Sequence, residues 1–243
     1  MLSKIETRLI RLFCAIAYFL LISIGYFIFA LFFKIRLEGI ENLPKKGRFI
    51  LAANHQNFFD GFFLSFITGP LKVVNFVVAK RALKSKFNTM LMKAIGGILI
   101  DNGIEEYQRA LKKLNNILKH GGRIGIFPEG DISKNPIPHR FKGGVAKLSI
   151  DSQSKVVPIY IKGTYNLRFL KYWLKRHEII VKIGKPFELY SYFAICGNNL
   201  EQTAMVLREA IIELGSSVEN KIFEKAIIKN QLPTKSLPVK ESV

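Results

Sequence analysis

The first part of the chain is dominated by one long apolar run. Residues 12–33 form 22 consecutive positions without a charged side chain. As one helix they would measure about 33 Å, enough to cross a hydrocarbon core of about 30 Å. A secretory signal peptide competes with this interpretation, but the run is long and no small-x-small cleavage site precedes Lys34. The pattern predicts that residues 1–34 attach the protein to a membrane.

The form of this attachment stays open in the sequence. Ser23 and Gly25 lie in the middle of the run, so a bent pair of helices within one leaflet competes with a single spanning helix. Basic residues flank the run on both sides, so the positive-inside rule does not predict its orientation in the membrane. They are Lys4, Arg8 and Arg11 before the run and Lys34 and Arg36 after it.

Beyond residue 34 the pattern alternates between short apolar runs and longer amphipathic stretches. The short runs predict strands over 35–40, 49–53, 73–79, 123–127, 156–161 and 179–183. The longer stretches predict helices over 61–67, 103–120, 144–150 and 200–214, with further helix after that. Strands that alternate with helices favour an α/β fold with a mainly parallel central sheet flanked by helices. We expect one domain over 35–230 and a flexible tail over 231–243.

The amino-acid composition indicates what kind of partner the protein binds. The net charge of +19 indicates an anionic partner, which can be nucleic acid, acidic lipid headgroups or a phosphorylated substrate. The apolar N-terminus favours an anionic membrane surface, and no nucleic acid is expected. Cys14 and Cys196 have no metal-like spacing and suggest no disulfide framework, which is compatible with a reducing compartment. We therefore expect a protein of the inner (cytoplasmic) membrane whose folded domain faces the cytoplasm.

The strongest chemical signal is the pair His55 and Asp60, at the point where the strand over 49–53 ends and a helix begins. A carboxylate that binds one ring nitrogen of a histidine leaves the other free to act as a general base. Asp60 is also favoured near the positive end of the following helix. The competing interpretation is a structural histidine beside a helix-capping aspartate.

A second stretch, Phe127-Pro128-Glu129-Gly130, favours the catalytic interpretation. Together with Asn54-His55-x4-Asp60 it resembles the N-H-x4-D and F-P-E-G motifs of the glycerolipid acyltransferase family, typified by 1-acylglycerol-3-phosphate acyltransferases. The resemblance implies transfer of a fatty acyl group from acyl-CoA or acyl-carrier protein to a lysophospholipid hydroxyl, with no cofactor. His55 would be the base and Asp60 would orient it.

In the resembled family the F-P-E-G segment lines the acceptor site. The resemblance therefore assigns acceptor-binding roles to a set of residues, with Glu129 placed to hydrogen-bond a glycerol hydroxyl (Asn54, Phe127, Pro128, Glu129 and Gly130). Three cations are candidates for the acceptor's phosphate by position (Lys80, Arg81 and Lys142). The competing interpretation is a solvated surface cation, which is the commoner fate of a lysine.

The chain departs from the family pattern at two places. Asn102 stands where the family has an arginine that helps to hold the phosphate, and Asp131-Ile132 replaces Thr-Arg after the F-P-E-G motif. The expected acceptor is 1-acylglycerol-3-phosphate, giving phosphatidic acid. Another lysolipid, such as lysophosphatidylglycerol or a lyso-ornithine lipid, stays open.

Other classes are less well supported. No spacing resembles a zinc site or a phosphate-binding P-loop, so no metal is expected. The sequence contains no G-x-S-x-G elbow, which argues against a serine esterase. Residues 164–177 mix aromatic and cationic side chains, a pattern that suits a membrane interface, single-stranded nucleic acid or the edge of a core. A non-catalytic basic membrane-binding protein and a thioesterase remain as rival hypotheses.

Overall fold

The computed structural model describes residues 4–230 apart from 70–72, 84, 95, 102, 134, 136, 166 and 168–176. Seven strands form one sheet in the order β1-β7-β6-β2-β5-β3-β4. Their bounds are β1 Lys34–Glu38, β2 Phe49–Ala53, β3 Val74–Ala79, β4 Gly97–Ile100, β5 Arg123–Ile126, β6 Val156–Lys162 and β7 Glu178–Ile183. Every neighbouring pair is parallel except β6 and β7, which are antiparallel. The expected mainly parallel α/β fold is confirmed.

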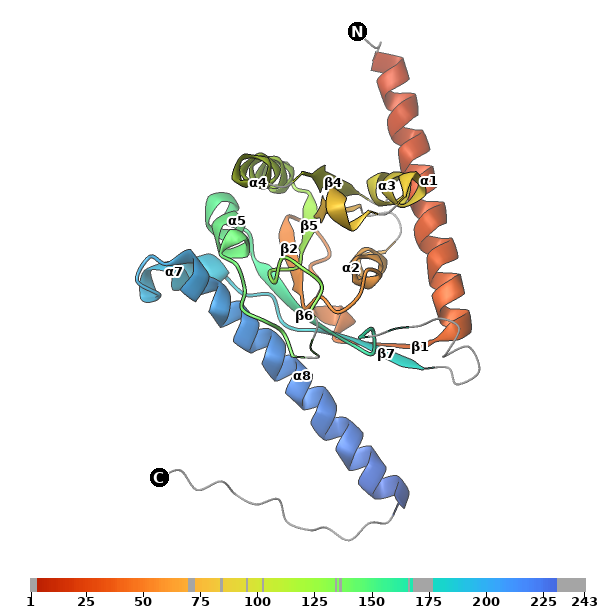
Figure 1. The fold of residues 1–243 in the computed structure, drawn as a ribbon, viewed down its shortest axis with the longest axis vertical. Coiled ribbons are helices and arrows are strands. Elements are labelled where there is room, and N and C mark those ends of the chain that lie inside the picture. Colours follow the sequence, from red (N-terminus) through yellow and green to blue (C-terminus); the bar gives the residue numbers. More distant parts are fainter. Residues whose placement is uncertain are drawn as a thin grey trace.

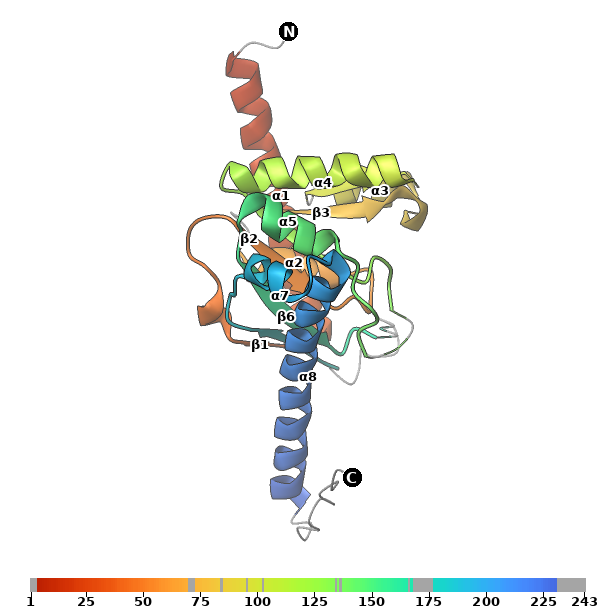
Figure 2. The ribbon, with the colours of Figure 1, turned by 90° about the vertical axis from the view of Figure 1, so that its left-hand side faces the viewer.

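Helices cover both faces of this sheet (Figure 1). One face packs against α1 Lys4–Phe32, α2 Asp60–Ile67 and α3 Lys86–Ala94. The other packs against α4 Ile104–Lys119, α5 Gly144–Ser152 and α8 Leu200–Asn230. A short helix, α7 Tyr192–Ile195, precedes α8, and three 3-10 turns complete the fold (η1 Ile40–Asn42, η2 Lys80–Ala82, η3 Leu189–Ser191). Figure 2 shows α4 and α5 lying across their face of the sheet.

The position of β2 in the middle of the sheet explains why its sequence is entirely apolar. All five of its side chains are buried, because it lies between β5 and β6 and both of its faces are covered by helices. Phe49, Leu51 and Ala53 join the core under α1 and α2, whereas Ile50 and Ala52 join the core under α4, α5 and α8. A strand buried on both sides is an unbroken apolar run, not an alternating one.

The apolar N-terminal run forms one continuous helix, α1, and not a bent pair. Its buried residues Tyr18, Ile22, Phe29 and Phe33 recur at helical spacing and form one stripe that packs on the domain. Within this stripe the ring of Phe29 stacks on that of Phe62 of α2, with centroids 5.1 Å apart. Among the described residues, α1 is the one helix long and apolar enough to cross a membrane, over Ala15–Phe32.

The predicted elements lie within a few residues of the observed ones, and α3, β4 and α7 were not predicted. The expected tail over 231–243 and most of the aromatic and cationic segment over 164–177 lie outside the described residues.

Two glycines in the connection between β1 and β2 both have positive φ angles, but only one of them lies against the sheet. Gly39 has a φ of 76°, and a Cβ there would lie 2.1 Å from the carbonyl oxygen of Ile183 in β7. Gly47 has a φ of 87° but nothing within 4 Å of such a Cβ. Gly47→Ala should therefore cost only the left-handed backbone penalty, about 1–2 kcal/mol. Gly39→Ala should cost about 3 kcal/mol or more, because the backbone of β7 must also move.

Thermal unfolding of both variants in detergent micelles measures this difference. Equal losses of stability would show that Gly39 does not touch β7 in the folded protein.

Candidate active site

The candidate site lies at the carboxyl end of β2, where the chain leaves the sheet for α2. Asn54, the first residue after the strand, is fully buried and exchanges two hydrogen bonds with Ile161 of β6. Its Nδ2 donates to the carbonyl oxygen of Ile161 at 2.9 Å, and its Oδ1 accepts from the N–H of Ile161 at 2.7 Å. Asn54 thus continues the β2–β6 pairing by one residue and fixes the backbone that carries His55.

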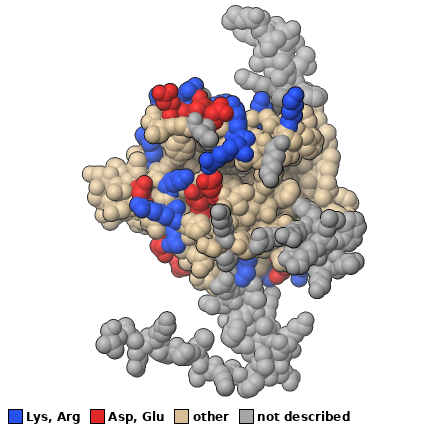
Figure 3. Space-filling model, in the orientation of Figure 1, with Lys and Arg blue, Asp and Glu red and all other residues tan. Residues whose placement is uncertain are grey.

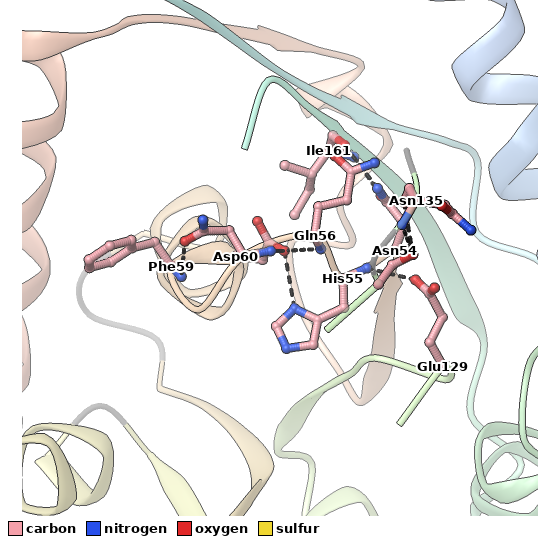
Figure 4. Close-up of polar contacts among 10 residues, drawn as sticks. Asn54, His55, Gln56, Phe59, Asp60, Glu129, Asn135 and Ile161 are labelled. Carbon is pink, nitrogen blue, oxygen red and sulfur yellow. Dashed lines mark hydrogen bonds and ion pairs between the residues drawn. The ribbon is translucent and has the colours of Figure 1, made fainter. Parts of the chain in front are cut away.

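Asp60 is the centre of the hydrogen bonds in the loop that follows (Figure 4). Its side chain is fully buried, and its Oδ2 accepts the backbone N–H groups of Gln56 at 2.6 Å and Asn57 at 2.7 Å. The same oxygen lies 3.1 Å from Nδ1 of His55. As the first residue of α2, Asp60 also sits at the positive end of the helix dipole. No described residue bonds its Oδ1.

These contacts determine the tautomer of His55. Because Oδ2 of Asp60 is an acceptor, Nδ1 of His55 must carry the hydrogen, and Nε2 then has a free lone pair when the ring is neutral. The imidazole stacks on Phe127 with ring centroids 4.0 Å apart and planes inclined by 16°. No hydrogen bond from a described residue reaches Nε2, and His55 lines a cavity. The ring is therefore held on two sides and open at the nitrogen that a base uses.

Glu129 contacts the backbone of His55, although 74 residues separate the two in the sequence. Its Oε1 accepts the backbone N–H of His55 at 2.8 Å, and its Oε2 accepts that of His139 at 2.9 Å. The carbonyl oxygen of His55 in turn accepts the N–H of Ser133 at 2.7 Å. The carboxylate of Glu129 thus joins the loop after β2 to the loop after β5. Its expected contact with a glycerol hydroxyl stays a prediction.

A cavity of about 640 Å³ opens in front of His55. Near the histidine it is lined by Phe127, Pro128 and Gly130, and farther away by apolar side chains of several elements. These include Leu21, Ile24 and Ile28 of α1, Phe58, Phe59 and Phe62 at α2, and Leu91 and Met92 of α3. The cavity therefore combines one polar, reactive end with a long apolar wall.

The predicted phosphate-binding cations lie at different places around this cavity. Arg81 lines it and pairs with Asp131, with Nη2 and Oδ1 2.9 Å apart. Asp131, which stands where the family has a threonine, therefore binds one of the predicted phosphate-binding cations. Lys80 pairs with Asp101 and does not line the cavity. Lys142 lines it, and its chain lies over Gly130, where a Cβ would come within 2.5 Å of Nζ. Asn102 lies outside the described residues.

Sequence reasoning did not identify Ser133, His139 and Tyr107 as parts of the site. The first two lie in the loop after β5, and their backbone groups face Glu129 and His55. Tyr107 of α4 lines the cavity beside Gly144, and burial raises the pKa of its phenol. Within the described part of the chain, no three His, Cys, Asp or Glu side chains gather as a metal site would require. The expected absence of a metal stays a prediction.

Comparisons with known proteins agree with the motifs. The model of the Acyltransferase family matches residues 34–162. The chain is 30% identical over 142 residues to the chloroplastic 1-acyl-sn-glycerol-3-phosphate acyltransferase LPAT1 of Arabidopsis thaliana, covering 55% of this chain and 37% of that protein. It is 33% identical over 162 residues to the 1-acyl-sn-glycerol-3-phosphate acyltransferase of Saccharomyces cerevisiae, covering 63% and 51%. The chain thus spans about half or less of these relatives.

A solved structure has the same fold. The crystal structure of the 1-acyl-sn-glycerophosphate (LPA) acyltransferase PlsC from Thermotoga maritima aligns with a TM-score of 0.60 at 24% identity, covering 80% of this chain and 78% of that one.

The two hydrogen bonds of Glu129 predict the effect of an isosteric change. In Glu129→Gln one carboxylate oxygen becomes an amide NH₂, which cannot accept, so the N–H of His55 or of His139 loses its partner. That amide should exchange with deuterium about tenfold faster, as the loss of a charge-assisted hydrogen bond predicts. Hydrogen-exchange mass spectrometry over both loops measures this.

Asp131→Asn is the matched control, because Asp131 is exposed and its ion pair with Arg81 does not involve either amide. Unchanged exchange at both histidine amides in Glu129→Gln would contradict the bridging role.

Proposed function

Because the chain belongs to the Acyltransferase family, we propose that it transfers a fatty acyl group from a thioester to the hydroxyl of a lysophospholipid. The observation that carries the proposal is the open Nε2 of His55, aligned by Asp60 and facing a largely apolar cavity. The names of the relatives favour 1-acylglycerol-3-phosphate as the acceptor and phosphatidic acid as the product. Lysophosphatidylglycerol and lyso-ornithine lipid are the alternatives.

The proposed reaction needs one proton to move twice. Nε2 of His55 takes the proton of the acceptor hydroxyl as its oxygen attacks the thioester carbonyl. Oδ2 of Asp60 holds Nδ1–H and stabilises the imidazolium that forms. When the tetrahedral intermediate collapses, the carbon–sulfur bond breaks and the thiolate takes the proton from Nε2. The products are the new ester and a free thiol, and the protein needs no covalent intermediate.

The apolar wall suits the fatty chains of the substrates. Side chains of α1, α2 and α3 line it, and burying methylene groups there is favourable by about 0.8 kcal/mol each. We propose acyl-CoA or acyl-carrier protein as the donor, with the acyl chain in the cavity and the carrier outside. No cofactor takes part in this scheme.

Cations at the cavity suit the phosphate of the acceptor. Arg81 and Lys142 both line it, and the ion pair between Arg81 and Asp131 is exposed. Such pairs contribute only about 0–1 kcal/mol, so a phosphate monoester with nearly two charges can displace Asp131 from Arg81. Lys80 is paired with Asp101, which lines the cavity, so it can assist the phosphate only if that ion pair opens. In this proposal Asn54 and Glu129 position the backbone of the site, while Phe127, Pro128 and Gly130 form its wall.

Membrane attachment follows from α1. The domain covers one side of this helix from Tyr18 to Phe29, while Phe27, Leu31 and other apolar residues stay exposed. A helix covered in this way along most of its apolar length fits within one leaflet better than across the bilayer. We propose that α1 lies in the cytoplasmic leaflet of the inner membrane with the catalytic domain in the cytoplasm, where the donor thioesters are made.

The decisive test of the chemistry is thiol release from an acyl-CoA that depends on added lysolipid. Asp60→Asn should lower kcat by about 10²–10⁴-fold, because the amide no longer holds the active tautomer. His55→Gln should lower it at least as much. His120→Gln is the matched control, since His120 is exposed and its Nδ1 binds only the carbonyl oxygen of Asn116.

Release of thiol without any acceptor would identify a thioesterase. Lipid binding that depends on salt, with no thiol release at all, would instead support a non-catalytic binding protein.

The acceptor's phosphate predicts a different kinetic effect at Arg81. Arg81→Ala should raise KM for 1-acylglycerol-3-phosphate about tenfold and leave kcat nearly unchanged, because the charge contact is made equally in the ground and transition states. Lys155→Ala is the control, since Lys155 pairs with Glu188 and does not line the cavity. A panel of lysolipids assayed with both variants identifies the headgroup, and an unchanged KM for every lysophosphate would remove Arg81 from the acceptor site.

A further inference from the structure

The helix α3 has two contrasting sides. Leu91 and Met92 face inward and line the cavity. Phe87 and Met90 face outward, with exposed fractions of 65% and 62%. On this nine-residue helix, an aromatic ring and a thioether therefore leave most of their surface uncovered by the domain. Grouped apolar side chains of this kind mark a surface that another phase or molecule covers.

The charges on α3 indicate what covers it. Phe87 and Met90 are three residues apart and share one side of the helix. Lys86 lies four residues before Met90 and Lys93 three residues after it, so the two lysines flank Met90. An apolar ridge between lysines fits a membrane interface, where rings and thioethers enter the acyl region and the ammonium groups reach the headgroups. The net charge of +19 adds attraction to anionic lipids.

The helix α3 lies against α1, which also exposes apolar residues. The two helices contact each other, and α1 exposes a series of apolar residues along its length (Phe19, Leu20, Ile24, Phe27, Ile28 and Leu31). Ile24 and Ile28 line the cavity while they are 56% and 42% exposed, so the cavity opens along this edge of α1. Figure 3 shows Lys and Arg side chains over α3 beside uncharged surface.

We propose that the outer side of α3, formed by Lys86, Phe87, Met90 and Lys93, is a second membrane-binding surface that docks on an anionic lipid bilayer beside α1. Two contacts fix the tilt of the domain, which a single helix leaves free. With α1 and α3 both in the interface, the edge of the cavity at Ile24 and Ile28 meets the acyl region. The acceptor's fatty chain then enters from the leaflet without crossing water. This last consequence rests on the proposed acyl transfer, but the docking itself does not.

The direct test places a fluorophore on α3. In full-length protein carrying Trp173→Phe, which removes the one tryptophan of the sequence, Phe87→Trp introduces a single emitter on α3. Vesicles of phosphatidylcholine and phosphatidylglycerol with bromine on the acyl chains should quench it strongly. Ile195→Trp is the matched control, because Ile195 is 79% exposed on α7, on the opposite side of the domain from α1 and α3 (Figure 1).

Quenching in the Phe87→Trp variant alone supports the proposal. No quenching there, or equal quenching in both variants, overturns it, and a concentration-dependent change without vesicles would identify a contact between protein copies instead.

A second measurement uses loss of binding. Phe87→Ser with Met90→Ser should weaken partition into the same vesicles by about tenfold or more, because two largely exposed apolar side chains no longer enter the lipid. Ile195→Ser should leave partition unchanged, and unchanged partition in the double variant would contradict docking through α3. Acyl transfer by both variants in detergent micelles should equal that of the parent protein. Failure of acyl transfer in the parent itself would reject the proposed function while leaving the docking result standing.

Discussion

One carboxylate oxygen, Oδ2 of Asp60, organises the candidate site. It accepts two backbone N–H groups from the turn before α2 and faces Nδ1 of His55, all within 3.1 Å. The backbone bonds fix the carboxylate, and the carboxylate then fixes the imidazole. Because the residue is fully buried, water cannot replace any of these partners. The base is therefore oriented before any substrate arrives, which is the condition for general-base catalysis without reorganisation.

The surrounding fold keeps this small loop rigid from three directions. Asn54 ties the end of β2 to β6, and Glu129 ties the backbone of His55 to the loop after β5. Phe127 stacks on the free side of the imidazole. The carboxyl ends of neighbouring parallel strands supply all three residues or the loops that carry them, the usual place for ligand sites in α/β sheets. Apolar side chains of α1 and α3 then complete the cavity with a surface suited to lipid.

Much of this architecture was predictable from the sequence, because its signals are local. The apolar run of β2, the helical spacing in α4 and the pair His55 and Asp60 each depend on neighbours within a few residues. The roles of Asn54 and Glu129 were not predictable, since their partners lie 107 and 74 residues away. The pairing of Arg81 with Asp131 is equally nonlocal, with 50 residues between them. The short α3 and β4 carry too few residues for a clear period.

Nuclear magnetic resonance can test directly whether Asp60 holds His55 in the Nδ1–H tautomer. Nitrogen-15 NMR of the imidazole rings distinguishes the two tautomers, and comparison with His55→Gln assigns the signal among the four histidines of the chain. We predict an Nδ1–H tautomer with an unprotonated Nε2 for His55 in the neutral state. In Asp60→Asn that preference should be lost. An Nε2–H tautomer for His55 in the parent protein would show that Asp60 does not orient the ring for catalysis.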